Sequence, residues 1–560
     1  MLFRSSALFG GVALVLAAMA PLGGAAAFTL GSSNEAVIEP PVPHPDETPC
    51  VVPLVSQAVF GANAVAFDYT PPAACPGPWA TVVLSVDIAL NAGVQFDRTG
   101  ELFLAGVPLW FGTTAEPREK LAPSWNVQRD VTDYSALYRT GQTGSLLIAN
   151  FTSAVDTSVI TASASLSFYP ATSTAPAPVT ADLVIPLPAG GGIATLNTGT
   201  DTLATTLTLP TNILDATLDL YLQSQQDDEF WYTCVPTALA NELQSCSNGA
   251  LREGEISVDG VPAGVAPIYP WIFTGGIDPA LWEPIPGVQT LSFKPAHADL
   301  SPFAGVLSNG QPHTVAASVF GANQHFSATG ALRLFLDPKA ANVTGGIVTN
   351  TLAGTPTVNL VQNLTNQNGV ISGTVDTGDS RDFTISGTVT GSAGELVKTL
   401  TQRSTFQNNQ SFLINSTLFT QNIQQVTDIY TTETTTGGGV TSVADTELHY
   451  PLTVLITLAG PNAAGGFAQT TSIDQKFVES DFAFGSQPGK SPVFSAQESN
   501  EINTTDTLLF DQNFNITGNQ DQSSVATFQT DNPCFRRVLT AEASVLTGVK
   551  TGGLNCCLGE

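Results

Sequence analysis

Acids, an arginine and aromatic residues crowd into two stretches of this chain, and these residue types could carry out acid–base chemistry. The first stretch contains Asp97 and Arg98, with Glu116 a short distance downstream. A carboxylate can activate a water molecule, and an arginine can stabilise negative charge that develops on an oxygen. An acid beside a base is also typical of an exposed surface ion pair, so this stretch alone indicates only a candidate centre.

The second stretch is denser in acids. Residues 227–229 are three consecutive acids directly before Phe-Trp-Tyr, which includes Trp231, and Asn248, Arg252 and Glu253 follow. Aromatic faces pack on the C–H groups of sugars, and carboxylates accept hydrogen bonds from sugar hydroxyls, so this composition favours a sugar site. The alternative is a solvated acidic turn beside two aromatic residues of the core.

Motifs for other chemistries do not occur. The five histidines are scattered, and no His or Cys spacing of the zinc type is present. The sequence has no Gly-x-Ser-x-Gly elbow, complete phosphate loop or dinucleotide fingerprint. We therefore expect neither a metal nor a cofactor.

The elements that position these residues should be β-strands. Short runs rich in Val, Ile, Leu, Thr and Phe are bounded by Gly, Pro, Asn and Asp, and no window keeps a helical period over three turns. These runs include residues 81–90, 102–107, 145–151, 158–168 and 216–222. The pattern predicts an all-β protein.

Two shifts in composition divide the chain. Residues 170–178 read as a Pro/Ala/Thr linker, and a second candidate boundary follows the apolar run that ends at Pro338. Beyond it the sequence is rich in Thr, Asn, Gln, Ser and Gly, but it still alternates between polar and apolar residues. We expect domains at 28–178 and 179–338 and a C-terminal β-rich accessory domain at 339–560.

The N-terminus and the cysteines point to export. Residues 1–27 have the charged start, apolar run and small-residue end of a signal peptide. Seven cysteines in an exported chain predict disulfides with one cysteine left over. Proximity in sequence suggests Cys50–Cys75, Cys234–Cys246, and Cys534 with Cys556 or Cys557. A secreted or periplasmic protein is expected, and no segment after the signal peptide is apolar enough to span a membrane.

The charge balance excludes some partners. Lys and Arg number 18 against 47 acids, which gives a formal net charge of −29. Such a charge argues against nucleic acid and against an anionic membrane as partners. Few bases also mean little self-repulsion once the carboxylates are protonated, which favours tolerance of low pH; an ordinary acidic exported protein is the alternative.

Several motifs resemble a known family. In the order and at spacings that fit, the chain resembles the acid-active peptide-N4-(N-acetyl-β-glucosaminyl)asparagine amidases of the PNGase A type over roughly residues 50–340. The motifs are Gln95-Phe-Asp-Arg98, Thr114-Ala-Glu-Pro117, Glu229-Phe-Trp-Tyr232, Asn248-Gly-Ala-Leu-Arg-Glu253, Phe273-Thr-Gly-Gly276 and Leu281-Trp282. Two departures are Glu283, where a base is expected after Trp282, and Cys234 after the Trp-Tyr pair.

A weaker similarity extends to PNGase F, through Phe96-Asp97-Arg98 and residues 130–134. This resemblance implies two adjacent antiparallel jelly-roll β-sandwiches, followed here by the C-terminal β-rich domain. It also implies a catalytic aspartate at Asp97. The register of the second catalytic acid falls on Asn248, which is not a carboxylate, so that acid has to come from Glu229, Glu253 or a neighbour, in that order of preference.

The resemblance implies hydrolysis of the amide between asparagine and the first GlcNAc of N-linked glycans. Asp97 would activate the water or the substrate amide, and Glu229 or Glu253 would protonate the leaving nitrogen. Arg98 or Arg252 would stabilise the oxyanion. The substrate-binding candidates are Glu116, Trp231, Asn248 and Trp282.

The partners implied are N-glycosylated peptides and glycoproteins, and a monomer is expected. Two other function classes fit the same residues. A β-sandwich glycosidase also uses two carboxylates beside tryptophan. A non-catalytic glycan-binding module needs only the sugar site.

Overall fold

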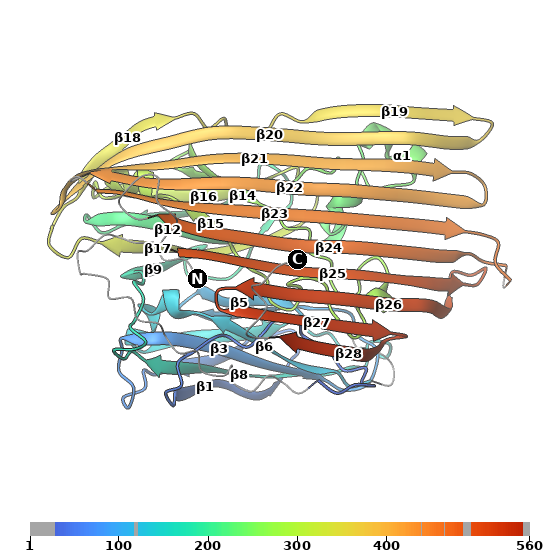
Figure 1. The fold of residues 1–560 in the computed structure, drawn as a ribbon, viewed down its shortest axis with the longest axis horizontal. Coiled ribbons are helices and arrows are strands. Elements are labelled where there is room, and N and C mark those ends of the chain that lie inside the picture. Colours follow the sequence, from blue (N-terminus) through green and yellow to red (C-terminus); the bar gives the residue numbers. More distant parts are fainter. Residues whose placement is uncertain (1–27, 117–120, 438–439, 464, 485–493, 553–560) are drawn as a thin grey trace.

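The computed structural model describes residues 28–116, 121–437, 440–463, 465–484 and 494–552. Strands dominate it and all sheets are antiparallel, which confirms the predicted all-β class (Figure 1). The predicted signal peptide, residues 1–27, lies outside the described residues.

The first unit is an eight-stranded sandwich. Its two four-stranded sheets have the orders β1-β8-β3-β6 and β2-β7-β4-β5. This order defines a jelly roll, in which each sheet alternates strands from the two ends of the chain segment. The strands are β1 (Cys50–Val59), β2 (Val65–Tyr69), β3 (Trp79–Leu90), β4 (Thr99–Leu104), β5 (Val107–Thr113), β6 (Ser124–Asp130), β7 (Gln142–Ile148) and β8 (Ile160–Pro170), with 3₁₀ turns η1 (Thr132–Tyr134) and η2 (Leu137–Arg139).

The second unit repeats this topology. Its sheets have the orders β10-β17-β12-β15 and β11-β16-β13-β14, and β9 and β10 pair in succession along the same edge of β17. The strands are β9 (Leu183–Leu187), β10 (Ala194–Leu196), β11 (Leu203–Thr208), β12 (Ile213–Ser224), β13 (Glu253–Val258), β14 (Val261–Pro267), β15 (Ala296–Asp299), β16 (Pro312–Phe320) and β17 (Phe326–Leu336). Its short helical turns are η3 (Gln226–Asp228), η4 (Trp231–Thr233), α1 (Thr237–Leu243), η5 (Pro279–Trp282), η6 (Ser301–Phe303) and α2 (Ala304–Leu307).

The third unit is one eleven-stranded sheet. From β20 onward each strand pairs with the next along the chain, and β18 and β19 pair in succession along the outer edge of β20. The strands are β18 (Thr344–Asn350), β19 (Asn359–Gln367), β20 (Val370–Gly391), β21 (Gly394–Ile414), β22 (Leu418–Gly437), β23 (Val440–Ala459), β24 (Ala468–Phe484), β25 (Phe494–Phe510), β26 (Ile516–Asp531), β27 (Cys534–Glu542) and β28 (Val545–Gly552).

This sheet lies across the jelly rolls (Figure 1). In β21 every second residue from Lys398 to Ile414 is buried, because successive side chains of a strand point to opposite faces. Phe383, Ile385 and Leu400 of the sheet share one hydrophobic core with the second jelly roll. The predicted boundaries near 178 and 338 fall between the sheets, and separate domains at those boundaries stay a prediction.

Two predicted disulfides are confirmed, Cys50–Cys75 and Cys234–Cys246. Cys534 is also disulfide-bonded, whereas Cys556 and Cys557 lie outside the described residues. In the part of the chain that the structure describes, no helix is long and apolar enough to cross a membrane.

Candidate active site

Two acids of the first jelly roll meet because their strands pair. Asp97 lies just before β4 and Glu116 lies just after β5, and these two strands form an antiparallel hairpin. The backbone N–H of Thr114 donates to the carbonyl of Arg98 (2.8 Å), and the Arg98 N–H donates to Oγ1 of Thr114 (2.9 Å). The hairpin ends therefore hold both carboxyl groups on the same edge of the sandwich.

The second jelly roll brings a glycine against both carboxyl groups. The backbone N–H of Gly275 donates a hydrogen bond to Asp97. A Cβ atom built on Gly275 would lie 2.8 Å from Oδ1 of Asp97 and 3.0 Å from Oε2 of Glu116. The two acids therefore converge on a backbone position where a side chain would collide with them.

Glu229 completes the group from the end of η3, directly after β12. Burial raises its pKa to about 7, and the charge of Asp97 adds to this shift. Burial, Asp97 and Glu283 raise the pKa of Glu116 to about 8. Burial also raises the pKa of Asp97, although Arg98 and the Gly275 N–H oppose the shift.

We call Asp97, Glu116 and Glu229 the carboxyl cluster. Like-charged neighbours in a poorly solvated site cannot all ionise together, so the cluster retains protons well above the ordinary pKa of a carboxyl group. It therefore combines groups that can act as a base and as proton donors in mildly acidic solution.

Arg98 supplies positive charge beside the cluster. Its Nη2 donates to Oε1 of Gln95 (2.5 Å), and its guanidinium lies over the exposed ring of Phe96 at 5.8 Å from the ring centroid. Its Nε is buried and has no hydrogen-bond partner among the described residues. A donor remains available for an oxygen that develops negative charge at this point.

Arg252 has a different role. Its guanidinium is fully buried against Asp228, with Nε and Nη2 each 2.9 Å from Oδ1 of the carboxylate. Its Nη1 donates to the carbonyls of Gly249 and Leu251. Because these contacts occupy the guanidinium, the expectation that Arg252 could stabilise an oxyanion is corrected, and Arg98 is the arginine beside the cluster.

Glu253 contacts the large sheet and not the carboxyl cluster. This first residue of β13 forms a buried ion pair with Arg381 of β20. Burial raises the pKa of Glu253 to about 7 despite the opposing charge of Arg381. Of the two acids proposed as partners of Asp97, Glu229 is the one whose pKa Asp97 affects, whereas Glu253 joins the second jelly roll to the large sheet.

Comparison with known proteins places this site in a family. The sequence profile described as Peptide N-acetyl-beta-D-glucosaminyl asparaginase amidase A matches residues 40–353, which include the whole carboxyl cluster. The chain belongs to this family. Over 380 residues it is 29% identical to peptide-N4-(N-acetyl-beta-glucosaminyl)asparagine amidase A of Prunus dulcis, and the match covers 64% of this chain and 65% of that relative.

The chain is also similar to solved structures at low identity. PNGase F, a glycosylasparaginase from Flavobacterium meningosepticum, matches with a TM-score of 0.34 and 12% identity over 52% of this chain and 96% of that one. PNGF-II matches with a TM-score of 0.36 and 13% identity over 52% of this chain and 65% of the other.

The two tryptophans proposed to grip a glycan are not accessible in this amidase A family member. Trp231 and Trp282 are 0% and 1% exposed. Trp231 packs near Phe406 of the sheet, and Nε1 of Trp282 donates to the carbonyl of Gly276 (2.8 Å). Burial leaves neither indole with a free face for a sugar; Trp231 packs near the large sheet, and Trp282 holds the carbonyl of Gly276.

Asn248 is exposed but engaged. It has a positive φ of 78°, and its Nδ2 donates to the carbonyl of Gly321 (2.7 Å). Sequence reasoning missed three groups that the structure places at the cluster, Phe96, the Gly275 N–H and Glu283. Phe96 belongs to the motif Gln95-Phe-Asp-Arg98, and Gly275 belongs to Phe273-Thr-Gly-Gly276. Membership in these motifs is the sequence signal by which both residues could have been found.

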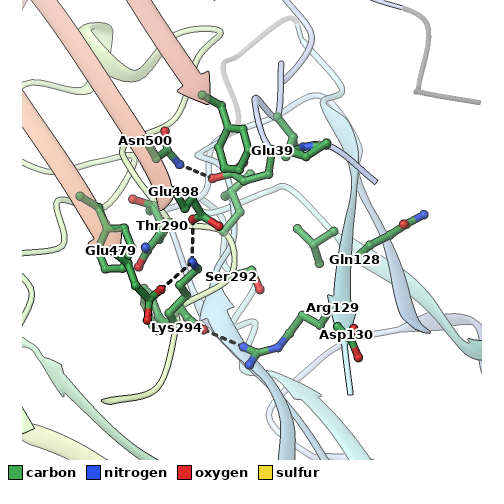
Figure 2. Close-up of a pocket in the computed structure, with 18 of the residues that line it drawn as sticks. Glu39, Gln128, Arg129, Asp130, Thr290, Ser292, Lys294, Glu479, Glu498 and Asn500 are labelled. Carbon is green, nitrogen blue, oxygen red and sulfur yellow. Dashed lines mark hydrogen bonds and ion pairs between the residues drawn. The ribbon is translucent and has the colours of Figure 1, made fainter. Parts of the chain in front are cut away.

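A large cavity lies apart from the cluster. It has a volume of about 950 Å³ between the first jelly roll, the second and the large sheet, and none of the predicted site residues lines it. In Figure 2 the ammonium group of Lys294 lies between Glu479 (3.3 Å) and Glu498 (2.6 Å). Asn500 donates to Glu39 in the same wall. This cavity is therefore separate from the carboxyl cluster.

Proposed function

We propose that this chain hydrolyses the amide between asparagine and the first GlcNAc of N-linked glycans. Family membership supports the reaction class. The observation that carries the proposal is the approach of Asp97 and Glu116 to Gly275, together with the position of Glu229, which lies close enough to Asp97 for that charge to raise the pKa of Glu229. The chain spans 65% of the length of its Prunus dulcis relative, whose printed name describes this amidase activity.

In the proposed reaction Asp97 accepts the proton of a water molecule as the water oxygen attacks the amide carbon. Arg98 donates to the resulting oxyanion, and such positioned donors contribute several kcal/mol, about 3–4, in other hydrolases. Glu229, protonated because burial and Asp97 raise its pKa, gives a proton to the leaving nitrogen as the C–N bond breaks. The products are an aspartate-containing peptide and a glycosylamine, which together account for the atoms of substrate and water.

Glu116 would remain protonated in acidic and neutral solution, since its pKa is raised to about 8. A neutral carboxyl group beside Asp97 can donate a hydrogen bond to the substrate without adding negative charge. Exposed Phe96 offers a ring face to the first sugar, the role that buried Trp231 and Trp282 cannot fill.

The substrates would be N-glycosylated peptides and glycoproteins outside the cytoplasm, acted on by a monomer that is secreted or periplasmic. Disulfides support an oxidising compartment. The net charge of −29 weighs against nucleic acid or an anionic membrane as partner.

The test is to incubate the full chain with a defined N-glycopeptide at pH 5 and pH 8 in H₂¹⁸O and to determine the mass of both products. We expect an intact glycan and a peptide with labelled aspartate in place of asparagine. Asp97→Asn should lower kcat by about 10²–10⁴, while the exposed control Asp68→Asn should not change it. A GlcNAc left on asparagine would identify a glycosidase, and glycan binding without cleavage would identify a binding module; either result refutes the amidase.

A further inference from the structure

The inner face of the large sheet carries a row of buried polar side chains. In β21 and β22 these include Asn408, Gln410 and Gln421, which are at most 4% exposed. Gln475 of β24 is fully buried as well. A buried side-chain amide is costly unless it is hydrogen-bonded, so the partners of these amides indicate the role of this face.

The partners of the first group are consecutive carbonyls of one loop. Asn408 Nδ2 donates to the carbonyl of Tyr232 (2.8 Å), Gln421 Nε2 to that of Thr233 (2.8 Å), and Gln410 Nε2 to that of Cys234 (2.9 Å). These carbonyls begin three residues after Glu229. The amides also bond to one another, since Gln421 donates to Gln410 and Gln410 donates to Asn408.

The partners of the second group belong to the loop that carries Gly275 and Glu283. Gln475 Nε2 donates to the carbonyl of Pro270 (2.7 Å), and Gln469 Nε2 donates to that of Ile277 (3.0 Å). Further along, Gln522 Nε2 donates to the carbonyl of Glu283 (3.0 Å).

We propose that the eleven-stranded sheet is a positioning scaffold for the carboxyl cluster, and that its inner-face amides fix the two loops carrying Glu229 and Gly275. The consequence for catalysis rests on the proposed function. The site loops form short turns such as η4 and η5 and join no sheet, so side-chain donors of the sheet help to set where Glu229 and the Gly275 N–H lie relative to Asp97. The third unit is then an integral part of the catalytic centre rather than an accessory domain.

The direction of the hydrogen bonds supports this role. In the contacts above the sheet donates from side-chain amides, and the loops accept through backbone carbonyls. A side-chain amide can reach an irregular loop without the loop having to join a β-ladder, and linked amides hold one another in place. Gln421, Gln469 and their neighbours are thus positioning residues that act through the loops and do not touch substrate.

The test compares Gln421→Leu and Gln469→Leu with Gln424→Leu, all in the full chain. Gln424 lies on the exposed face of the same strand as Gln421, so its substitution alters the sheet without touching a loop. Hydrogen exchange followed by mass spectrometry is measured on peptides 229–235 and 270–283 at a temperature where all variants are folded. We expect faster exchange in 229–235 for Gln421→Leu, faster exchange in 270–283 for Gln469→Leu, and no change for Gln424→Leu.

Kinetics on the glycopeptide test the catalytic consequence. A displacement of about 1 Å can cost on the order of 10²-fold in rate, so we expect kcat to fall by about 10–100-fold with KM little changed. The alkaline limb of the pH–rate profile should also move, because the pKa of Glu229 depends on its burial and its closeness to Asp97.

Unchanged loop exchange in both inner-face variants would overturn the scaffold, and so would faster exchange with unchanged kcat and pH profile. A wild-type chain that releases no glycan would refute the proposed function instead, and the exchange data would still decide whether the sheet holds the loops. Gln469 is only half-buried, so its variant remains informative if Gln421→Leu does not fold.

Discussion

Replacing Glu229 by glutamine should stabilise the folded chain at alkaline pH while abolishing its turnover. The pKa of Glu229 is raised from 4.5 to about 7, chiefly by burial and further by Asp97. For an acid whose folded pKa is raised, the folded state binds the proton more tightly than the unfolded chain does. Ionisation of Glu229 therefore does not affect the free energy of unfolding below about pH 4.5. It lowers that free energy increasingly up to about pH 7 and by a constant amount above pH 7.

The size of the effect follows from the shift. A shift from 4.5 to about 7 corresponds to roughly 3.4 kcal/mol at 1.36 kcal/mol per unit. Because the side chain retains some contact with solvent, we discount this to about 1.5–2 kcal/mol. Glutamine keeps the shape and cannot ionise, so Glu229→Gln should be more stable than wild type by that amount at pH 8 and nearly equal to it at pH 4.

The assay is urea unfolding at pH 4, 6 and 8, followed by tryptophan fluorescence, with Glu447→Gln as the matched control. Glu447 is an exposed carboxylate on the sheet, and its substitution should give the same small difference at each pH. The glycopeptide assay should show a loss of kcat of about 10²–10⁴ for Glu229→Gln. A stability difference that does not change between pH 4 and pH 8 would refute the assignment of Glu229 to a buried, charge-repelled site.

Three further outcomes are expected. In the glycopeptide assay Glu253→Gln should lower kcat less than Glu229→Gln, because Glu253 faces Arg381 of the sheet rather than Asp97; a larger loss of kcat would make Glu253 the catalytic acid instead. Gly275→Ala should lower kcat with little change in Tm, because the new Cβ displaces Asp97, and wild-type kinetics would show that the two do not meet. The wild-type chain should lose unfolding free energy between about pH 4 and pH 8, the window between ordinary and raised carboxyl pKa values, and a stability maximum near pH 8 would contradict it.

The sequence by itself determined the class of fold and pointed to the site that we propose as catalytic. Period-two alternation and frequent turn residues predicted strands, because a half-buried strand exposes every second side chain. Cysteines close in sequence predicted Cys50–Cys75 and Cys234–Cys246 correctly. The motif around Asp97 pointed to one strand end, and the structure places Asp97 in the carboxyl cluster.

Only the tertiary structure decided which groups face Asp97. Glu229 and Glu253 are both acids of the second acidic stretch, and nothing in the sequence around them shows which one faces Asp97. One approaches Asp97 across the boundary of two jelly rolls, whereas the other meets Arg381 of the sheet. Burial likewise removed Trp231 from the list of sugar contacts. Such outcomes depend on how segments more than a hundred residues apart pack together, and neither side-chain alternation nor motif spacing encodes that packing.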